Sequence, residues 1–163
     1  MTLEWMGEYR ELVEALMHYC NIYASAYKLE KQTYHGIAYS YAQMQVLECL
    51  LENEDRQEHM SAVASRLGIT RSHFSKIVSR LESKGLVEKK CRPGSRKELL
   101  VTVLPLGREL YNDYAQEILR WHFSPMFENL HKLPPEQRNH VRDALQSAMQ
   151  GSVFWQEKNS EHP

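Results

Sequence analysis

Two short amphipathic patterns stand on either side of Gly68. The first has a narrow apolar face made of Met60, Val63, Ala64 and Leu67. The second repeats apolar side chains at the spacing of a packed helix and consists of Phe74, Ile77, Val78 and Leu81. Because Gly68 ends the first pattern and Gly85 ends the second, both helices are short, and small Ala64 lets their backbones approach closely. The arrangement predicts a helix-turn-helix whose second helix covers residues 71–84.

A hairpin pattern follows this second helix directly. Residues 86–90 and 99–103 have the composition of strands, and Pro93, Gly94 and Ser95 between them favour a turn. A basic β-hairpin immediately after the second helix is a wing. The sequence therefore predicts a winged helix-turn-helix lobe over residues 36–104.

Longer helical patterns flank this lobe. Apolar residues recur every three or four positions from Trp5 to Lys31, which predicts one long helix, and a break follows over 33–38. Ser40 and Gln43 have the spacing of a capping box, in which each side chain satisfies the other's free backbone N–H. A helix over 41–52 and a polar loop over 53–58 are expected after it.

Two further helices are expected beyond the wing, over 105–130 and 135–149, with the break at Leu133, Pro134 and Pro135. The fold class is thus mainly α with a small β wing. We expect an N-terminal dimerisation helix in residues 1–35, C-terminal dimerisation helices in 105–150 and a tail over 151–163.

Positive charge is concentrated in residues 66–97, which we call the basic island. It holds ten Lys or Arg and two Glu, a balance of +8, whereas the other 131 residues balance at −9. A basic surface on an otherwise acidic chain is the pattern of a protein that meets phosphates on one side. The overall charge of −1 therefore does not exclude a nucleic-acid partner.

Other function classes find little support in the sequence. The nearly apolar run over 99–106 is too short to span a bilayer, and the charged residues near the start do not fit a secretory signal, so we expect a cytoplasmic protein without a membrane segment. Three separated cysteines without a CxxC pair predict reduced thiols. The histidines have no HExxH or similar spacing, and no third group orients Ser72 and His73, so we expect no metal, no cofactor and no enzyme.

Four stretches resemble the MarR family of regulators. They read SYAQMQVL at 40–47, VASRLGITRS at 63–72, RLESKGLV at 80–87 and LPLGREL at 104–110. The resemblance covers residues 8–150 and implies an obligate homodimer, intertwined through the first and the last two helices, with a wing tip that reaches the minor groove. Wings of the family often carry Asp-x-Arg, whereas Ser95, Arg96 and Lys97 stand here, so either cation takes the arginine's role.

The face of helix 71–84 opposite its apolar side predicts contact with double-stranded DNA. Small hydroxyls and a few long cations let a helix lie deep in the major groove. We expect base contacts from Arg71, Ser72, Ser75 and Lys76, and phosphate or minor-groove contacts from Arg80, Arg92, Arg96 and Lys97, with His73 and Ser79 beside them. The alternatives are a merely solvated face, or a winged-helix module that binds an acidic protein without sequence-specific DNA binding.

The terminal helices predict a homodimer. Three long amphipathic helices present more apolar surface than a lobe of this size can cover, and a two-fold assembly would cover it. Such a dimer places its paired second helices about 34 Å apart, which predicts an inverted-repeat site. The alternative is that these helices complete the core of a monomer.

Many relatives are released from DNA by a small molecule bound between the dimer helices and the lobe, which implies a repressor. Tyr19, Tyr23, His35 and Trp121 are candidates to line such a crevice, although aromatic residues at this spacing also suit a plain core. Cys20 and Cys91 are candidate redox-active thiols, with an inert thiol as the alternative for Cys20 and simple exposure on the wing for Cys91.

Overall fold

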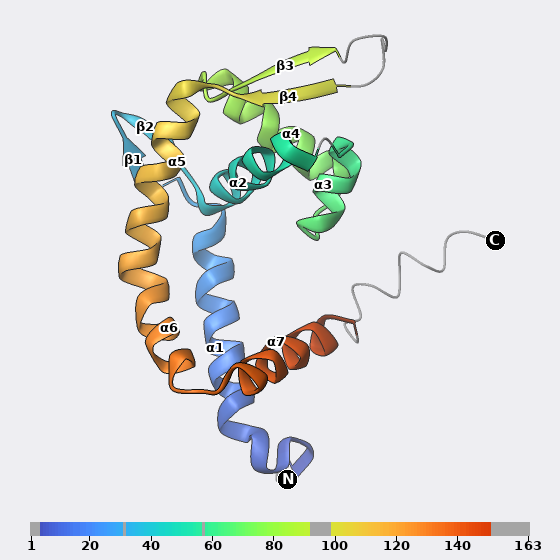
Figure 1. The fold of residues 1–163 in the computed structure, drawn as a ribbon, viewed down its shortest axis with the longest axis vertical. Coiled ribbons are helices and arrows are strands. Elements are labelled where there is room, and N and C mark those ends of the chain that lie inside the picture. Colours follow the sequence, from blue (N-terminus) through green and yellow to red (C-terminus); the bar gives the residue numbers. More distant parts are fainter. Residues whose placement is uncertain (1–3, 31, 57, 92–98, 151–163) are drawn as a thin grey trace, which may run out of the picture. The chain divides into compact units, whose positions relative to one another are not determined.

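The computed structural model of the chain describes residues 4–30, 32–56, 58–91 and 99–150 (Figure 1). Two compact units, residues 1–114 and 115–163, are described separately below. The first unit has a 3-10 helix (Glu4–Tyr9), α1 (Arg10–Tyr27), β1 (Gln32–Tyr34), β2 (Ile37–Tyr39), α2 (Tyr41–Arg56), α3 (Met60–Arg66), α4 (Arg71–Ser83), β3 (Val87–Cys91), β4 (Leu99–Val103) and most of α5 (Pro105–Ile118).

The core of the first unit lies among α2, α4 and the hairpin of β3 and β4. Helix α2 packs against α4 and β4, while α3 and β3 also pack against α4 (Figure 1). Its largest fully buried apolar side chains include Met44, Leu47, Leu50, Leu81, Leu86 and Leu110. Each such side chain removed from water stabilises the fold by about 1.5–3 kcal/mol. The predicted mainly helical fold, with a winged helix-turn-helix lobe and long terminal helices, is confirmed.

The wing is joined to α4 by Lys84, Gly85 and Leu86 alone. Gly85 has a φ of +70°, which a side chain would disfavour, and it turns the chain so that the N–H of Leu86 donates to the carbonyl of Leu81 at 3.0 Å. Strands β3 and β4 then pair antiparallel from Val87 opposite Val103 to Cys91 opposite Leu99. The wing is therefore anchored at the end of α4.

Helix α5 crosses the start of the wing at very short range. The carbonyl of Leu86 accepts from the N–H of Leu104 at 3.0 Å, and Gly107 lies directly over this carbonyl. A Cβ atom on Gly107 would overlap the Leu86 oxygen. Glycine at this position is what allows α5 and the wing to pack together.

Helix α2 begins as predicted and ends later than predicted. The capping box is confirmed, since the N–H of Gln43 donates to Ser40 Oγ at 3.4 Å and the N–H of Ser40 donates to Gln43 Oε1 at 3.3 Å. The predicted loop over 53–58 is wrong at its start, because α2 continues to Arg56. Buried Asn53 explains the difference: its amide accepts from the N–H of Glu58 at 2.9 Å and donates to the carbonyl of Glu58 at 3.1 Å, so the turn closes after the helix.

The N-terminal region departs from the single predicted helix at both ends. Gly7, with a φ of +51°, kinks the 3-10 helix that precedes α1, and α1 ends at Tyr27 rather than near Lys31. The predicted break over 33–38 is a short hairpin, with Gln32 opposite Tyr39 and with His35 and Gly36 at its turn. Strands of three residues are too short to leave an alternating pattern in the sequence.

The second unit contains a π-helical turn (Leu119–Phe123), α6 (Ser124–His131) and α7 (Pro135–Gln150). The helix predicted over 105–130 is present in extent but is interrupted by this turn. Pro125 gives the reason, because it has no N–H to donate and its ring would clash with the carbonyl of Trp121, four residues earlier. Among the described residues, no helix combines the length and the apolar character needed to cross a bilayer.

Candidate nucleic-acid interface

Helix α4 is fixed at its N-terminal end by Thr70. The backbone of Thr70 is extended, and its hydroxyl accepts from the N–H of His73 at 3.1 Å, which satisfies one of the free donors of the first turn. The apolar face predicted for this helix, Phe74, Ile77, Val78 and Leu81, is buried throughout. The cap and the buried face together orient the opposite side of α4.

The opposite face of α4 is open to solvent. The predicted base-contacting residues Arg71, Ser72, Ser75 and Lys76 are exposed, as are Ser79 and Arg80, whereas His73 is half-buried. Arg71, Ser72 and Ser75 also line a hollow of about 410 Å³ whose other walls come from α3, β3 and β4, including Met60 and Val101. The N-terminal half of α4 thus faces a recess between α3 and the wing.

The cations of the basic island fall into two groups. Four of them form ion pairs: Arg66 with Glu52 and Glu58, Lys84 with Glu30, Lys89 with Glu82, and Lys90 with Glu88. Arg71, Lys76 and Arg80 form no ion pair within residues 4–30, 32–56, 58–91 and 99–150, and all three project from α4. Among the described residues of the basic island, the cations without an ion pair therefore all lie on the exposed side of this helix.

A polar contact connects the wing with α4. Lys89 Nζ lies 2.8 Å from Glu82 Oε2 and donates to Ser79 Oγ at 2.8 Å, while the N–H of Lys89 donates to Glu82 Oε1 at 3.2 Å. Hydrogen bonds from Lys89 hold the pKa of the Glu82 carboxyl below its ordinary value. The sequence did not indicate that the Ser79 hydroxyl, expected to face DNA, is already engaged by the wing.

The wing-tip residues expected to meet phosphate or the minor groove lie outside the described residues. These are Arg92, Arg96 and Lys97. Their roles stay predictions from the sequence.

Two of the four predicted effector-pocket residues lie together. Tyr19 and Tyr23 stack with ring centroids 6.1 Å apart, and Tyr23 stacks on Tyr41 at 6.4 Å. Tyr27 and Tyr114 complete what we call the tyrosine cluster, with centroids 5.6 Å from Tyr23 and 6.2 Å from Tyr41, respectively. The spacing of residues 19, 23 and 27 along one helix face was a signal for Tyr27, whereas nothing in the sequence indicated Tyr114.

The tyrosine cluster is apolar at its centre and polar at one edge. Gln45 Nε2 donates to the hydroxyl of Tyr23 at 2.5 Å, and burial raises the pKa of Tyr23 to about 12. Of the remaining predicted residues, His35 lies in the turn of the first hairpin against Tyr34, and Trp121 belongs to the second unit, where the Arg120 guanidinium lies 5.1 Å from its ring centroid.

The cysteines differ in environment. Cys20 and Cys91 are exposed, whereas Cys49 is buried and burial raises the pKa of its thiol. Among the described residues, no three His, Cys, Asp or Glu side chains group in a way that could hold a metal ion.

A helix-turn-helix followed directly by a two-stranded hairpin, with cations on the exposed side of its second helix, defines the winged helix-turn-helix class. The family model that matches the chain is that of the MarR family, over residues 35–98. The matched stretch contains α2, α3, α4 and β3, so this part of the chain is similar to the MarR family.

Solved structures of the same fold cover nearly the whole chain. Sco3205, a MarR family transcriptional regulator from Streptomyces coelicolor solved in complex with DNA, is 22% identical, with a TM-score of 0.68 over 93% of this chain and 89% of that one. A cysteine-to-serine mutant of ZitR from Lactococcus lactis, also solved with DNA, is 14% identical, with a TM-score of 0.63 over 89% of this chain and 97% of that one.

The PcaV transcriptional regulator from Streptomyces coelicolor, solved with its natural ligand, is 16% identical, with a TM-score of 0.62 over 93% of this chain and 97% of that one. At these identities the likeness establishes the fold. A comparison with curated proteins found no match.

Proposed function

We propose that the chain is a sequence-specific regulator that binds double-stranded DNA by placing α4 in the major groove. The observation that carries this proposal is the exposed side of α4, where small hydroxyls stand among cations that form no ion pair within the described residues. An ion pair within the chain would neutralise the charge of these cations. Because they form none in the part of the chain that the structure describes, their charge is available to the phosphates of DNA. Sco3205 and the ZitR mutant, which have similar folds, were both solved in complex with DNA, and this supports DNA binding by the present chain.

Within this proposal some residues contact base edges and others contact phosphate or the minor groove. Arg71, Ser72, Ser75 and Lys76 approach base edges, with His73 and Ser79 beside them. Arg80 and the wing cations Arg92, Arg96 and Lys97 meet phosphate or the minor groove. The recess between α3, α4 and the wing leaves Arg71 and the two serines accessible to a duplex.

The regulator acts as a homodimer on an inverted repeat. Helix α1 buries none of its residues within the chain, although Leu12, Leu16 and Ile22 project from it. A second copy would cover such apolar side chains, and a two-fold axis would set the two α4 helices about one turn of DNA apart.

A small-molecule effector that releases a repressor from DNA is the finer part of the proposal. The tyrosine cluster supports it, because stacked aromatic rings with the Tyr23 hydroxyl at one edge can bind an aromatic molecule that carries polar groups. PcaV was solved with its natural ligand, which shows that a protein of this fold can accommodate one.

The test begins with selection of bound sequences from random duplex DNA, followed by affinity measurements over a range of salt concentrations. Affinity should fall steeply with salt, and the Arg80→Met variant should show a slope shallower by about 0.9 because one phosphate contact is lost. Lys28→Met, which removes an exposed cation at the end of α1, is the matched control and should leave the slope unchanged. Failure of the unaltered protein to bind any duplex at low ionic strength would contradict the proposal and favour a protein-binding module.

A further inference from the structure

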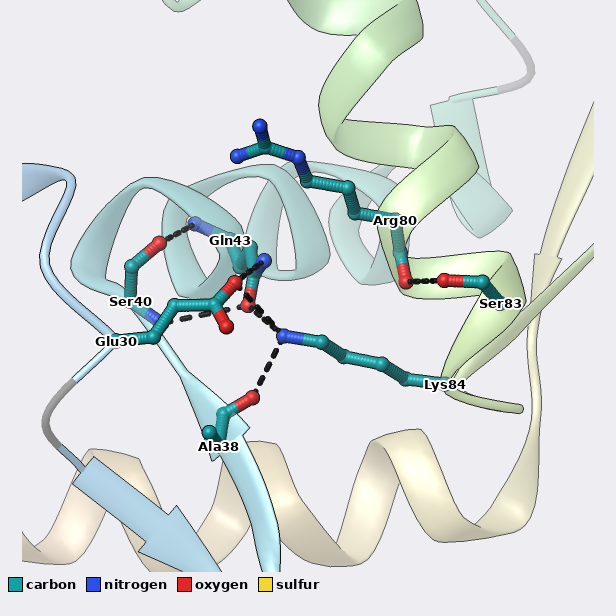
Figure 2. A network of polar contacts seen from close by, with 7 residues as sticks. All are labelled: Glu30, Ala38, Ser40, Gln43, Arg80, Ser83 and Lys84. Atoms are coloured by element: carbon teal, nitrogen blue, oxygen red, sulfur yellow. Dashed lines mark hydrogen bonds and ion pairs between the residues drawn. The ribbon is translucent and has the colours of Figure 1, made fainter.

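Lys84, at the C-terminal end of α4, is surrounded by acceptors from other segments. Its ammonium group donates to Glu30 Oε1 at 2.9 Å, to the carbonyl of Ala38 at 2.6 Å and to Gln43 Oε1 at 3.0 Å (Figure 2). An ammonium group has three hydrogens, so all of its donors are occupied. Lys84 belongs to the basic island by sequence but is directed inward.

The three acceptors come from three different parts of the unit. Glu30 follows the end of α1, Ala38 lies in β2, and Gln43 is the capping-box residue in the first turn of α2. Gln43 Nε2 also donates to Glu30 Oε1 at 2.6 Å, which closes a ring of contacts (Figure 2). We call these four residues the Lys84 network.

The network is well placed to resist movement. Gln43 and its capping partner Ser40 are almost completely buried, so this end is anchored in the core. The side chain of Lys84 is 20% exposed, which limits the screening of its pair with Glu30. The hydrogen bond from Lys84 also holds the pKa of Glu30 below its ordinary value, and the pair is therefore ionised at neutral pH.

The position of Lys84 connects the two regions that a dimeric reader must align. Helix α1 carries the uncovered apolar face proposed to meet the second copy, whereas α4 is the helix proposed to enter the groove. We propose that Lys84 is a positioning residue that fixes the C-terminal end of α4 to the segment after α1 and thereby sets the half-site spacing the dimer accepts. This inference rests on the proposed function.

The physical reason is that apolar packing restrains the position of α4 along its own axis less than directional hydrogen bonds do. The buried side chains Phe74, Ile77 and Val78 define which face points inward, but their apolar contacts are not directional. A change of one base pair in the spacing displaces a half-site by about 3.4 Å. Directional hydrogen bonds to a charged group resist such a displacement at the end of α4.

The experiment uses the full-length protein and a duplex selected by the unaltered protein, together with duplexes whose half-site spacing is one base pair shorter or longer. The variants are Lys84→Met and Glu30→Gln, and the matched controls are Lys28→Met and Glu14→Gln on α1. The preference is the ratio of the affinity for the selected spacing to that for an altered spacing. We expect this ratio to fall about tenfold in both variants, as the loss of a charged hydrogen bond implies, and to stay unchanged in the controls.

The salt dependence separates positioning from direct contact. Because Lys84 does not meet phosphate in this proposal, Lys84→Met should leave the slope of affinity against salt unchanged, in contrast to the decrease of about 0.9 expected for Arg80→Met. A decrease of that size in Lys84→Met, or an unchanged spacing preference in Glu30→Gln, would overturn the inference. Glu30→Gln keeps the shape of an exposed side chain, so it tests the network even where Lys84→Met does not fold.

The two levels of the proposal can fail separately. If the unaltered protein binds no duplex, the proposed function is wrong. If the unaltered protein binds a selected duplex and the variants discriminate spacing as it does, only the role of Lys84 is wrong.

Discussion

Helices α1 and α2 are similar in length but treat their apolar side chains in opposite ways. Helix α2 has 16 residues, of which eight are buried, including Met44, Leu47 and Leu50. Helix α1 has 18 residues and buries none of them, although Leu12 is 67% exposed and Leu16 and Ile22 are also exposed. Soluble chains rarely leave a continuous apolar stripe uncovered. The comparison indicates that α2 stabilises the chain itself, and it agrees with the proposal that α1 associates with a second copy.

The largest expected effect comes from substituting one leucine in each region. Leu81→Ala in α4 removes a completely buried side chain and should lower the free energy of unfolding by about 2–5 kcal/mol, measured by urea denaturation. Leu12→Ala should leave that free energy nearly unchanged at concentrations where the chain is dissociated, and should weaken self-association measured by ultracentrifugation. If both substitutions lower the free energy of unfolding of the dissociated protein equally, the two regions do not differ in the way proposed.

A smaller effect is expected at Gly107, where the lobe is packed most tightly. Replacing an exposed glycine inside a helix with alanine usually stabilises the protein by about 1 kcal/mol. Gly107→Ala should have the opposite sign and destabilise the protein by about 1–3 kcal/mol, because the new Cβ overlaps the Leu86 carbonyl. Thermal or urea unfolding measures the change, with Asn112→Ala, at an exposed position of α5, as the control that should be near neutral. A stabilised Gly107→Ala variant would show that α5 and the wing have room to separate.

The smallest expected effect concerns the cap of α4. Thr70→Ala removes the acceptor for the N–H of His73 and should cost about 1 kcal/mol of stability. Thr70→Ser retains the hydroxyl and should restore most of the loss. If urea denaturation gives the same free energy of unfolding for both variants, the hydroxyl of Thr70 does not contribute to the stability of α4.

The sequence was sufficient for the local parts of the fold. The buried side of α4, the capping box of α2 and the wing strands follow from residue spacing over fewer than 15 positions, and all of them are present. The exposed position of Ser72, Ser75 and Lys76 follows from the same helical period, since the residues opposite a buried face must point outward.

The differences arise where distant residues decide the structure. Lys84 and Glu30 are 54 positions apart, so no local pattern could show that one cation of the basic island is committed to an internal network. The extension of α2 to Arg56 depends on the contact of Asn53 with Glu58. The π-helical turn before α6 depends on Pro125, which lies within an otherwise continuous helical period of apolar residues. The β1–β2 hairpin requires His35 at a positive φ. This conformation is uncommon for residues other than glycine, so the presence of a histidine does not predict it.

The register of the wing has a practical implication for protein engineering. Among the described residues, the pairing of β3 with β4 runs from Val87 opposite Val103 to Cys91 opposite Leu99, and Lys89 within it contacts Glu82 of α4. The register of these pairs is therefore fixed next to α4, and added chain length beyond Cys91 should carry only a small entropic cost. Segments of other sizes grafted between these two strands should therefore leave the orientation of α4 unchanged.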